Sequence, residues 1–473
     1  MDVVSRALGQ CDDVIVVCDG CTDDTMSLLN AMPVKPVIIE LDVNQGKGTA
    51  LKTGFRYALE AGFAYAITLD GDGQHFPEDI PVMLEANRKH PGALIVGERK
   101  NLENADRSKG SSFANSFSNF WFAVQTGQYL KDTQTGYRLY PLKKLRGLSL
   151  LTSRYEAELE LMVFASWHGV KLVSEPVNVY YPPREERVSH FRPGKDFARI
   201  TVLNAVLCFL AVVYGLPLTI FRGLMTLLRT IYAIVFFIFT TLCMMTPLVH
   251  IYLLFGKITE KKKYNLHRIL NFMAKFVICY HKIPGVRYTQ KNNSGEDFTK
   301  PAVIICNHQS HLDLAPLLAL TPKVIVLTAD WVWNNPVYRF TIRNAEFLPA
   351  SSGVDAIMPQ LRSLVERGYS IAVYPEGTRS MDCSLGRFRQ GAFYVAQTLG
   401  IDVLPVVIYG TGKALKKRGR LLRKWPVHME IDRRITPEEM KLMGETTRQQ
   451  ASQMRKYYQK RYTEIADRIE QDV

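Results

Sequence analysis

His308 and Asp313 stand five positions apart, directly after the apolar run 302–306. At a strand-to-helix turn this spacing lets the carboxylate fix the tautomer of the imidazole, and the other ring nitrogen can then take a proton from a hydroxyl that attacks a thioester. Such general-base help is worth roughly 10²–10⁴-fold in rate. Backbone N–H groups at the start of the helix can meet the charge of the tetrahedral oxyanion. The pair therefore predicts acyl transfer to a hydroxyl group.

A second polar cluster, YPEGTRS (374–380), follows the apolar run 369–373. Arg379 comes after a glycine turn, and a guanidinium held in such a turn suits a phosphate group. An isolated His-x-x-x-x-Asp pair is usually accidental. Its combination with Asn307 and this second cluster is a specific signal for acyl-transfer chemistry.

Asp70 and Asp72 follow a third apolar run, 64–69. Two carboxylates so spaced at a strand end can bind a hard divalent cation whose remaining positions take diphosphate oxygens, and such a cation stabilises the charge of a leaving nucleoside diphosphate. Alone, an Asp-x-Asp is more often a solvated turn. Because the polar clusters 18–25 and 44–48 also follow apolar runs, the sequence favours a nucleotide-sugar site.

These clusters resemble glycosyltransferase family 2 of the GT-A fold, particularly its branch that uses polyprenyl-phosphate or other lipid acceptors. The match covers about residues 3–200 and rests on the runs CDGCTDDT (18–25), NQGKGTALKTGF (44–55), LDGDGQHFPEDIP (69–81), VGERK (96–100), DTQTGYRLYP (132–141) and RYEAELEL (154–161).

The resemblance implies roles for individual residues. Asp70, Asp72 and Gln74 would hold the metal, either Mg or Mn. Glu156 or Glu158 would be the functional carboxylate, with a general-base role toward an acceptor hydroxyl or, alternatively, a place on a solvated helix face. Asp19 would contact the nucleobase, Arg99 and Arg107 would contact acceptor or donor phosphate, and Lys47 belongs to the same substrate-binding set. Apart from the resemblance, His190 and Arg192 stand just before the membrane segment, where they could contact the phosphate of a lipid headgroup; interfacial snorkelling is the alternative.

The sequence departs from the family pattern in two places. Cys18 and Cys21 stand where the family turn usually carries acidic and hydroxylic residues. The family also begins with a strand and a Pro-x-Tyr-Asn-Glu-like turn, whereas residues 1–10 are typical of the helix that follows that strand. Either the true start lies upstream or this form lacks that strand, so we expect a GT-A domain whose first strand is missing from the given sequence.

The second block resembles the glycerolipid acyltransferase family, which contains the lysophosphatidate acyltransferases. NHQSHLD (307–313), YPEGTRS (374–380) and VLPVVI (403–408) carry the match, which covers about residues 229–434. The resemblance implies His308 and Asp313 as the catalytic pair, no cofactor, and acceptor binding by Glu376, Gly377, Thr378 and Arg379. The family usually has an arginine in its second sequence block, but the corresponding run 346–351 contains none.

The polar clusters need strands that bring them together. Apolar runs alternating with helical stretches predict an α/β fold class with mainly parallel sheets and ligand sites at the carboxyl ends of the strands. We expect four parts: a GT-A domain (1–199), a membrane segment (200–256), an acyltransferase domain (257–436) and an amphipathic C-terminal helix (437–473).

Residues 200–221 carry no charge, and residues 230–256 carry none apart from His250. Each run reaches the roughly 20 apolar residues that cross a bilayer as a helix, so one or two transmembrane helices are predicted, with a buried helix pair as the alternative. Basic residues flank both ends, so a hairpin of two spans would put both domains on the cytoplasmic side of the inner membrane. The basic run 413–424 favours an anionic membrane surface or an acyl carrier over a merely solvated face.

The net charge of +14 suits anionic lipid or phosphorylated substrates. Basic and aromatic residues do not interleave, so nucleic acid is not an expected partner. Together these features predict a bifunctional membrane enzyme of lipid or glycolipid biosynthesis, whose partners are a nucleotide sugar, acyl-CoA or acyl carrier protein, and a lipid acceptor. The alternatives are an acyltransferase with a degenerate first domain and a non-catalytic lipid-binding scaffold.

Overall fold

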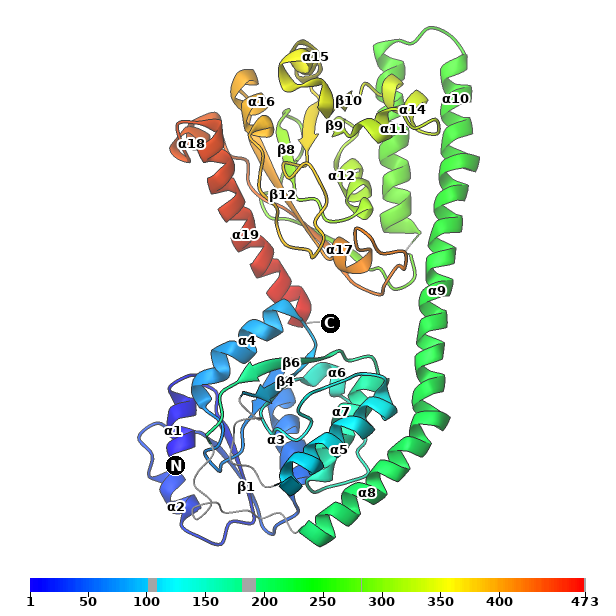
Figure 1. Ribbon diagram of the computed structural model, residues 1–473. Helices are drawn as coiled ribbons and strands as arrows, with labels where there is room; N and C mark the ends of the chain where they lie inside the picture. The colour runs from blue at the N-terminus through cyan, green and yellow to red at the C-terminus, as the bar shows by residue number, and fades with distance from the viewer. Residues whose placement is uncertain (101–108, 181–192, 282, 472–473) are drawn as a thin grey trace. The chain divides into compact units, whose positions relative to one another are not determined.

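The computed structural model describes residues 1–100, 109–180, 193–281 and 283–471 (Figure 1). The chain divides into two compact units, one from Met1 to Arg222 and one from Gly223 onward. Seven of the ten described strand pairings are parallel, which confirms the α/β fold class.

The first unit begins with a helix and a pair of parallel strands. The N-terminal residues form the expected helix α1 (Asp2–Leu8). Strands β1 (Ile15–Asp19) and β2 (Val37–Leu41) form a two-stranded sheet of their own, with Ile15 opposite Val37. Helices α2 (Thr25–Asn30) and α3 (Lys47–Glu60) follow these strands. The clusters 18–25 and 44–48 therefore lie at neighbouring carboxyl ends.

A second sheet of this unit has the order β3-β5-β4-β6. Its strand β5 runs antiparallel to both neighbours, and β4 pairs with β6 in parallel. Helices α5 and α7 pack against one another, and Phe122 and Met162 on them are fully buried in the core. The elements are β3 (Tyr65–Thr68), α4 (Ile80–Lys89), β4 (Leu94–Arg99), α5 (Lys109–Thr126), β5 (Arg138–Pro141), α6 (Leu142–Leu145), α7 (Glu156–Trp167) and β6 (Leu172–Val177).

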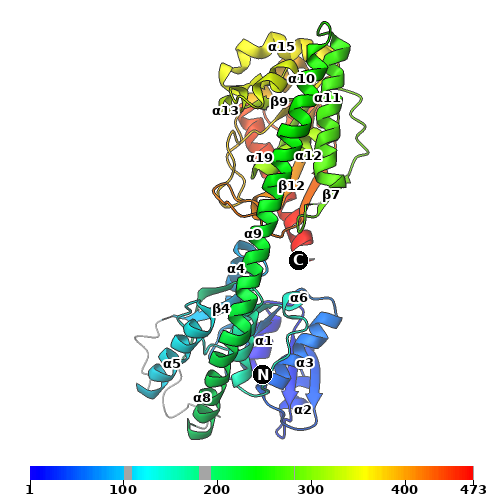
Figure 2. The ribbon, with the colours of Figure 1, turned by 90° about the vertical axis from the view of Figure 1, so that its right-hand side faces the viewer.

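The two charge-free runs of the sequence belong to one apolar helical segment. It contains α8 (Pro193–Leu210), α9 (Leu216–Ile238) and α10 (Thr246–Leu254), joined by π-helical turns (Figure 2). The segment covers residues 198–254, and only 22% of its most apolar stretch is buried within the protein. Among the described residues this is the one helix long and apolar enough to cross a membrane.

The second unit has a seven-stranded sheet of order β10-β9-β11-β8-β12-β13-β7. The five neighbouring strands β10, β9, β11, β8 and β12 run parallel, while β13 is antiparallel to β12. The strands are β7 (Tyr288–Asn292), β8 (Val303–Cys306), β9 (Val324–Thr328), β10 (Leu348–Pro349), β11 (Ser370–Val373), β12 (Val403–Tyr409) and β13 (Val427–Ile431). The helices are α11 (Glu260–Lys275), α12 (Leu314–Leu320), α13 (Asp330–Trp333), α14 (Arg339–Asn344), α15 (Val354–Glu366), α16 (Gly391–Leu399), α17 (Thr411–Ala414), α18 (Pro437–Leu442) and α19 (Thr447–Gln471).

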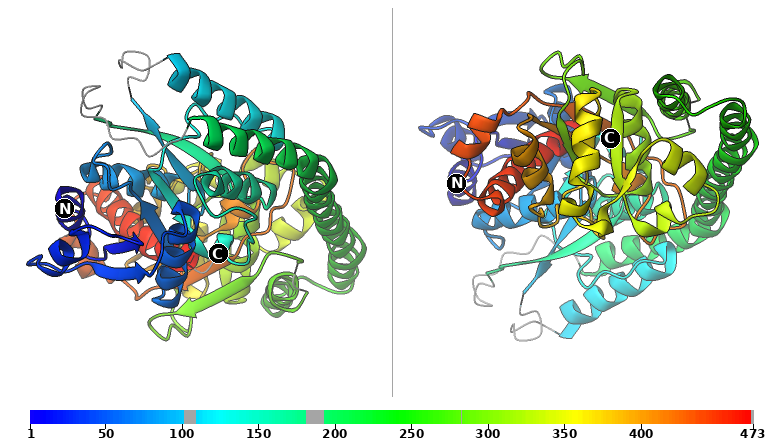
Figure 3. Two further views of the ribbon diagram at one scale, coloured as in Figure 1. Left: turned by 90° about the horizontal axis from the view of Figure 1, so that it is seen from below. Right: turned by 90° about the horizontal axis from the view of Figure 1, so that it is seen from above.

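The C-terminal helix α19 is part of the core of the second unit. It packs beside α16, as the right-hand view of Figure 3 shows in red and orange-brown. Met454, Tyr458 and Ile465 on this helix are fully buried, and the Tyr458 hydroxyl donates to the carbonyl of Ile305 in β8. The amphipathic pattern of the sequence thus reflects packing on the sheet.

Candidate active sites

The acyltransferase motifs converge at one edge of the seven-stranded sheet. Strand β8 lies between β11 and β12 and is parallel to both. His308 follows β8, the cluster 374–380 follows β11, and the basic loop 413–424 begins just after β12. Parallel neighbours end at the same edge, so this convergence follows from strand order, as the sequence predicts.

Asp313 orients His308. The His308 Nδ1 lies 2.9 Å from Asp313 Oδ2, and the same oxygen accepts from the backbone N–H groups of Gln309 at 2.7 Å and Ser310 at 2.8 Å. Asp313 is fully buried, and three hydrogen bonds to one oxygen hold the carboxylate rigidly. The arrangement places Nδ1–H on Asp313 and leaves Nε2 as the basic nitrogen.

The Tyr374 ring covers one face of His308. The two rings are 4.1 Å apart and inclined by 21°, which is a stacked geometry. This contact and Asp313 together restrict the imidazole to one rotamer, because Asp313 binds its Nδ1 edge and Tyr374 covers one of its faces. Such fixation is what general-base catalysis requires of its base.

Glu376 joins the two motif turns. Its Oε1 accepts from the backbone N–H of His308 and its Oε2 from that of Gly386, both at 2.7 Å. Burial raises the pKa of this carboxyl, and these two N–H groups work against that shift. Both oxygens are therefore engaged within the protein.

The other acceptor-binding candidates surround this turn. Gly377 has φ +68°, and a Cβ there would lie 2.9 Å from Cζ of Arg389. Lys417 Nζ donates to Thr378 Oγ1 at 3.0 Å and to the Arg379 carbonyl at 2.8 Å. The Arg379 guanidinium lines a pocket beside the turn.

Two polar groups that the sequence left without a role support this site. The Asn307 side chain exchanges two hydrogen bonds of 2.8 Å with the backbone of Ile408, which ties the end of β8 to β12. The Tyr462 hydroxyl on α19 donates to Gln309 Oε1 at 3.1 Å. Asn307 was visible in the motif, whereas nothing in the local sequence links Tyr462 to Gln309.

In the first unit, candidate residues form a partly buried ion network. Lys47 Nζ lies 2.6 Å from Asp70 Oδ1 and 2.9 Å from Glu158 Oε2. Burial alone would lower the pKa of Lys47, but the carboxylates of Glu158 and Asp70 outweigh it and raise that pKa. Arg138, which is 1% exposed, lies 3.3 Å from Glu158 Oε1. Glu158 is thus buried among cations, while Glu156 is half-buried at the start of α7.

The residues after β3 fit a divalent cation. Asp70, Asp72 and Gln74 supply carboxylate and amide oxygens, the donors that Mg²⁺ and Mn²⁺ prefer. The described part of the chain has no group of three His, Cys, Asp or Glu close enough to hold a metal, so the amide and substrate oxygens are needed. The Lys47 ammonium lies 2.6 Å from Asp70 Oδ1, so this oxygen already has a positively charged group beside it. A Cβ at Gly136 would lie 2.2 Å from Asp70 Oδ2, so this glycine makes room for the carboxylate.

Asp19 and Arg99 are engaged within the protein. The Asp19 carboxylate accepts from the backbone N–H groups of Gln45 and Gly46, both at 2.7 Å, and so joins β1 to the loop before α3. Arg99 makes a two-pronged contact with fully buried Asp132, at 2.6 and 2.8 Å. Sequence reasoning assigned no role to Asp132 or Arg138, although both lie in the run DTQTGYRLYP. Arg107, His190 and Arg192 lie outside the described residues.

Each of the two units matches a different known protein family. Residues 2–141 match the family model described as glycosyl transferase family 2, and residues 285–409 match the one described as acyltransferase. The chain joins a family 2 glycosyltransferase region to an acyltransferase region.

Curated relatives divide in the same way. An uncharacterized protein of Methanocaldococcus jannaschii is 31% identical over 36% of this chain and 70% of its own length. The UDP-N-acetylglucosamine–dolichyl-phosphate N-acetylglucosaminyltransferase of Methanococcus voltae is 27% identical over 36% of this chain and 75% of its own. The chloroplastic 1-acyl-sn-glycerol-3-phosphate acyltransferase LPAT1 of Arabidopsis thaliana is 35% identical over 24% of this chain. The chain spans 33% of that enzyme.

Solved structures give partial similarities. The 1-acyl-sn-glycerophosphate acyltransferase PlsC of Thermotoga maritima has a TM-score of 0.42 and 19% identity, over 52% of this chain and 97% of its own. Glucosyl-3-phosphoglycerate synthase of Mycobacterium tuberculosis has a TM-score of 0.34 and 16% identity, over 44% of this chain and 74% of its own.

Proposed function

We propose that this chain is a bifunctional membrane enzyme of lipid or glycolipid biosynthesis. One unit transfers a sugar from a nucleotide sugar to a lipid-type acceptor with the help of a divalent metal. The other transfers an acyl group from acyl-CoA or acyl carrier protein to a lipid hydroxyl. The observation that carries the proposal is the rigid Asp313–His308 pair, whose Nε2 has no protein partner among the described residues.

In the acyl transfer, His308 Nε2 takes the proton of the acceptor hydroxyl as its oxygen attacks the thioester carbonyl. The C–S bond then breaks, and the imidazolium returns the proton to the leaving thiolate, giving an ester and a free thiol. Asp313 stabilises the imidazolium because its buried carboxylate faces Nδ1–H. Arg379 and the turn 376–379 hold the acceptor beside His308.

In the glycosyl transfer, Asp70, Asp72 and Gln74 would hold Mg²⁺ or Mn²⁺, which stabilises the charge of the leaving nucleoside diphosphate. Lys47 adds a second positive charge at the same place and is held there by Glu158. Of the two candidate glutamates, Glu158 is the one in the ion network, so it is our candidate for the functional carboxylate. Asp19, Arg99, Arg107, His190 and Arg192 remain candidates for substrate contacts.

The membrane is the surface on which both acceptors are presented. The apolar helix through α9 supports this, and so does the basic loop, because the Leu422 N–H in it donates to Thr230 Oγ1 of α9 at 2.9 Å. Lys416, Arg418, Arg420, Arg423 and Lys424 of this loop are exposed. Cations beside an apolar helix bind anionic headgroups. We place both units on the cytoplasmic face of the inner membrane, which requires the apolar segment 198–254 to return to the same side or to lie along the membrane surface instead of crossing it once.

The test is lipid mass spectrometry on membranes from cells that express the chain and receive labelled nucleotide sugars and fatty acids. His308→Ala should remove an acyl mass increment, and Asp72→Ala should remove a sugar increment. Loss of the acyl increment alone would show that the first unit is inactive. A lipid profile unchanged in both variants would contradict both activities and favour a non-catalytic scaffold.

A further inference from the structure

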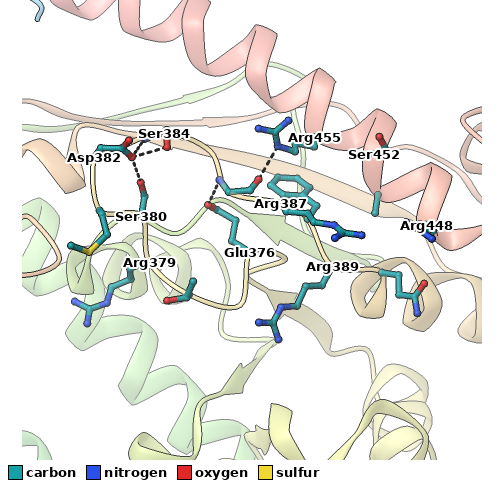
Figure 4. A pocket seen from close by; sticks show the side chains of 16 residues that line it. Glu376, Arg379, Ser380, Asp382, Ser384, Arg387, Arg389, Arg448, Ser452 and Arg455 are labelled. Atoms are coloured by element: carbon teal, nitrogen blue, oxygen red, sulfur yellow. Dashed lines mark hydrogen bonds between the residues drawn. The ribbon is translucent and has the colours of Figure 1, made fainter. Parts of the chain in front are cut away.

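A large pocket opens beside Glu376, between the loop 376–390 and the first turns of α19 (Figure 4). Its volume is about 1260 Å³. Its walls come from segments far apart in the sequence, so no motif reveals it. Glu376 lines the pocket and also binds the backbone of His308, which places an occupant next to the catalytic turn.

The pocket is unusually rich in arginine. Arg379, Arg387 and Arg389 come from the loop, and Arg448 and Arg455 come from α19. Arg455 has a structural task, because it donates to the backbone carbonyls of Gly386 at 2.9 Å and Leu385 at 3.2 Å. This contact fixes the loop against α19.

The other four guanidiniums have no carboxylate partner within the described part of the chain. The two acidic residues of the wall are already engaged. Glu376 accepts from two backbone N–H groups, and Asp382 Oδ1 accepts from Ser380 and from the backbone and hydroxyl of Ser384. The pocket therefore carries uncompensated positive charge.

Uncompensated guanidiniums that face one cavity suit phosphate, because each presents a planar fork of donors to two oxygens. Arg389 lies over Gly377, and Arg379 follows in the same turn. The run 346–351, where a second acceptor arginine was expected, contains none. Arg387 of the loop 376–390 and Arg448 of α19 supply positive charge that the run 346–351 does not.

Resting on the proposed acyl transfer, we propose that this pocket binds the phosphate-bearing part of one acyl-transfer substrate, with Arg387 and Arg448 as ligands. That phosphate belongs either to the acyl donor, as in coenzyme A, or to a phosphorylated lipid acceptor. The two sources share the same recognition chemistry, and binding measurements tell them apart.

The experiment is calorimetric titration of the full chain, purified in detergent, with coenzyme A and separately with glycerol 3-phosphate. The variants are Arg448→Ala, Arg448→Lys and Arg387→Ala. The matched control is Lys456→Ala, which removes an exposed charge from the same helix outside the pocket. His308→Ala is titrated in parallel, because it abolishes the chemistry without touching the pocket wall.

We expect Arg448→Ala and Arg387→Ala each to raise the Kd of one probe about tenfold or more, Arg448→Lys to have a smaller effect, and Lys456→Ala to have none. If the Kd of coenzyme A rises, the phosphate belongs to the acyl donor; if that of glycerol 3-phosphate rises, it belongs to the acceptor. The inference is wrong if neither Kd changes, or if Lys456→Ala weakens binding as much. Arginine-dependent binding should persist in His308→Ala, because His308 lies outside the pocket wall. Such binding by a wild-type chain that shows no acyl transfer would support the pocket and contradict the proposed function.

Discussion

The two units hold their charged candidate residues in different ways. In the acyltransferase unit, backbone N–H groups bind the carboxylates of Asp313 and Glu376, which leaves His308 Nε2 available to a substrate. In the glycosyltransferase unit, Asp19 and Asp72 also accept from backbone N–H groups. The candidate cations there bind carboxylate side chains, however: Lys47 pairs with Asp70 and Glu158, and Arg99 pairs with Asp132.

This difference has a chemical consequence. A carboxylate held by backbone N–H groups keeps its geometry when a substrate arrives, so the acyl-transfer site is preorganised. A carboxylate paired with lysine must exchange that partner before it can bind a metal. If Asp70 binds the proposed metal, Lys47 therefore has to move or to share this carboxylate.

The largest expected effect is in the preorganised site. His308→Ala should lower acyl transfer by roughly 10²–10⁴-fold, since it removes the general base. Asp313→Asn should approach this loss, because a neutral amide no longer stabilises the imidazolium that forms on His308. The measurement is transfer of labelled acyl groups by purified enzyme. His311→Asn, on the same turn, is the control.

Equal losses in His311→Asn and His308→Ala would show that the whole turn, rather than the base, is responsible. Sugar transfer by the same preparations should be unchanged in all three variants, because they lie in the second unit.

The next effect concerns the buried network of the first unit. Glu158→Gln leaves Arg138 charged and buried without its carboxylate, and breaking such a pair costs roughly 3–5 kcal/mol. We expect a clear drop in the free energy of unfolding and loss of sugar transfer, measured by denaturant titration and by a labelled-sugar assay.

Glu156→Gln is the matched variant, because Glu156 makes no ion pair among the described residues. Its unfolding free energy should change by less than about 0.5 kcal/mol. A similar loss in both variants would show that the Arg138–Glu158 contact does not stabilise the unit.

A more modest effect tests the competition at Asp70. Lys47→Met removes the ammonium from Asp70 Oδ1, so Mn²⁺ should bind about tenfold more tightly, which corresponds to about 1.4 kcal/mol. Sugar transfer should nevertheless fall, because a positive charge at the diphosphate is lost. Electron paramagnetic resonance of free Mn²⁺ measures the affinity.

Lys52→Met is the control on the same helix, where Lys52 Nζ donates to the Thr152 carbonyl. It should leave the Mn²⁺ affinity unchanged. An unchanged affinity in Lys47→Met would exclude Asp70 Oδ1 as a metal ligand.

The smallest effect concerns α19. Tyr462→Phe removes the hydrogen bond to Gln309, which contributes about 1 kcal/mol to stability. Acyl transfer should fall only a few-fold, because Asp313 still orients His308. Tyr457 lies on the same helix, and its hydroxyl donates to Asp432, just after β13. Tyr457→Phe should cost similar stability and leave the acyl-transfer rate unaltered.

Much of the fold could be predicted from local sequence. The apolar runs before the clusters 18–25, 44–48, 70–75, 307–313 and 374–380 are strands in the structure, since apolar runs bounded by turns form buried strands. The helix at residues 2–8 was predicted as well. The two charge-free runs were predicted separately, and the sequence did not show that one continuous helical segment contains both.

The sequence by itself determined which side chains stand at the strand ends, because the chemistry of those turns is local. Only the tertiary structure decided how they are paired. Lys47 meets Glu158, Arg99 meets Asp132, and Tyr462 meets Gln309 across long stretches of chain. Such contacts depend on how helices pack on sheets, and the same packing places Arg448 of α19 and Arg387 in the wall of one pocket.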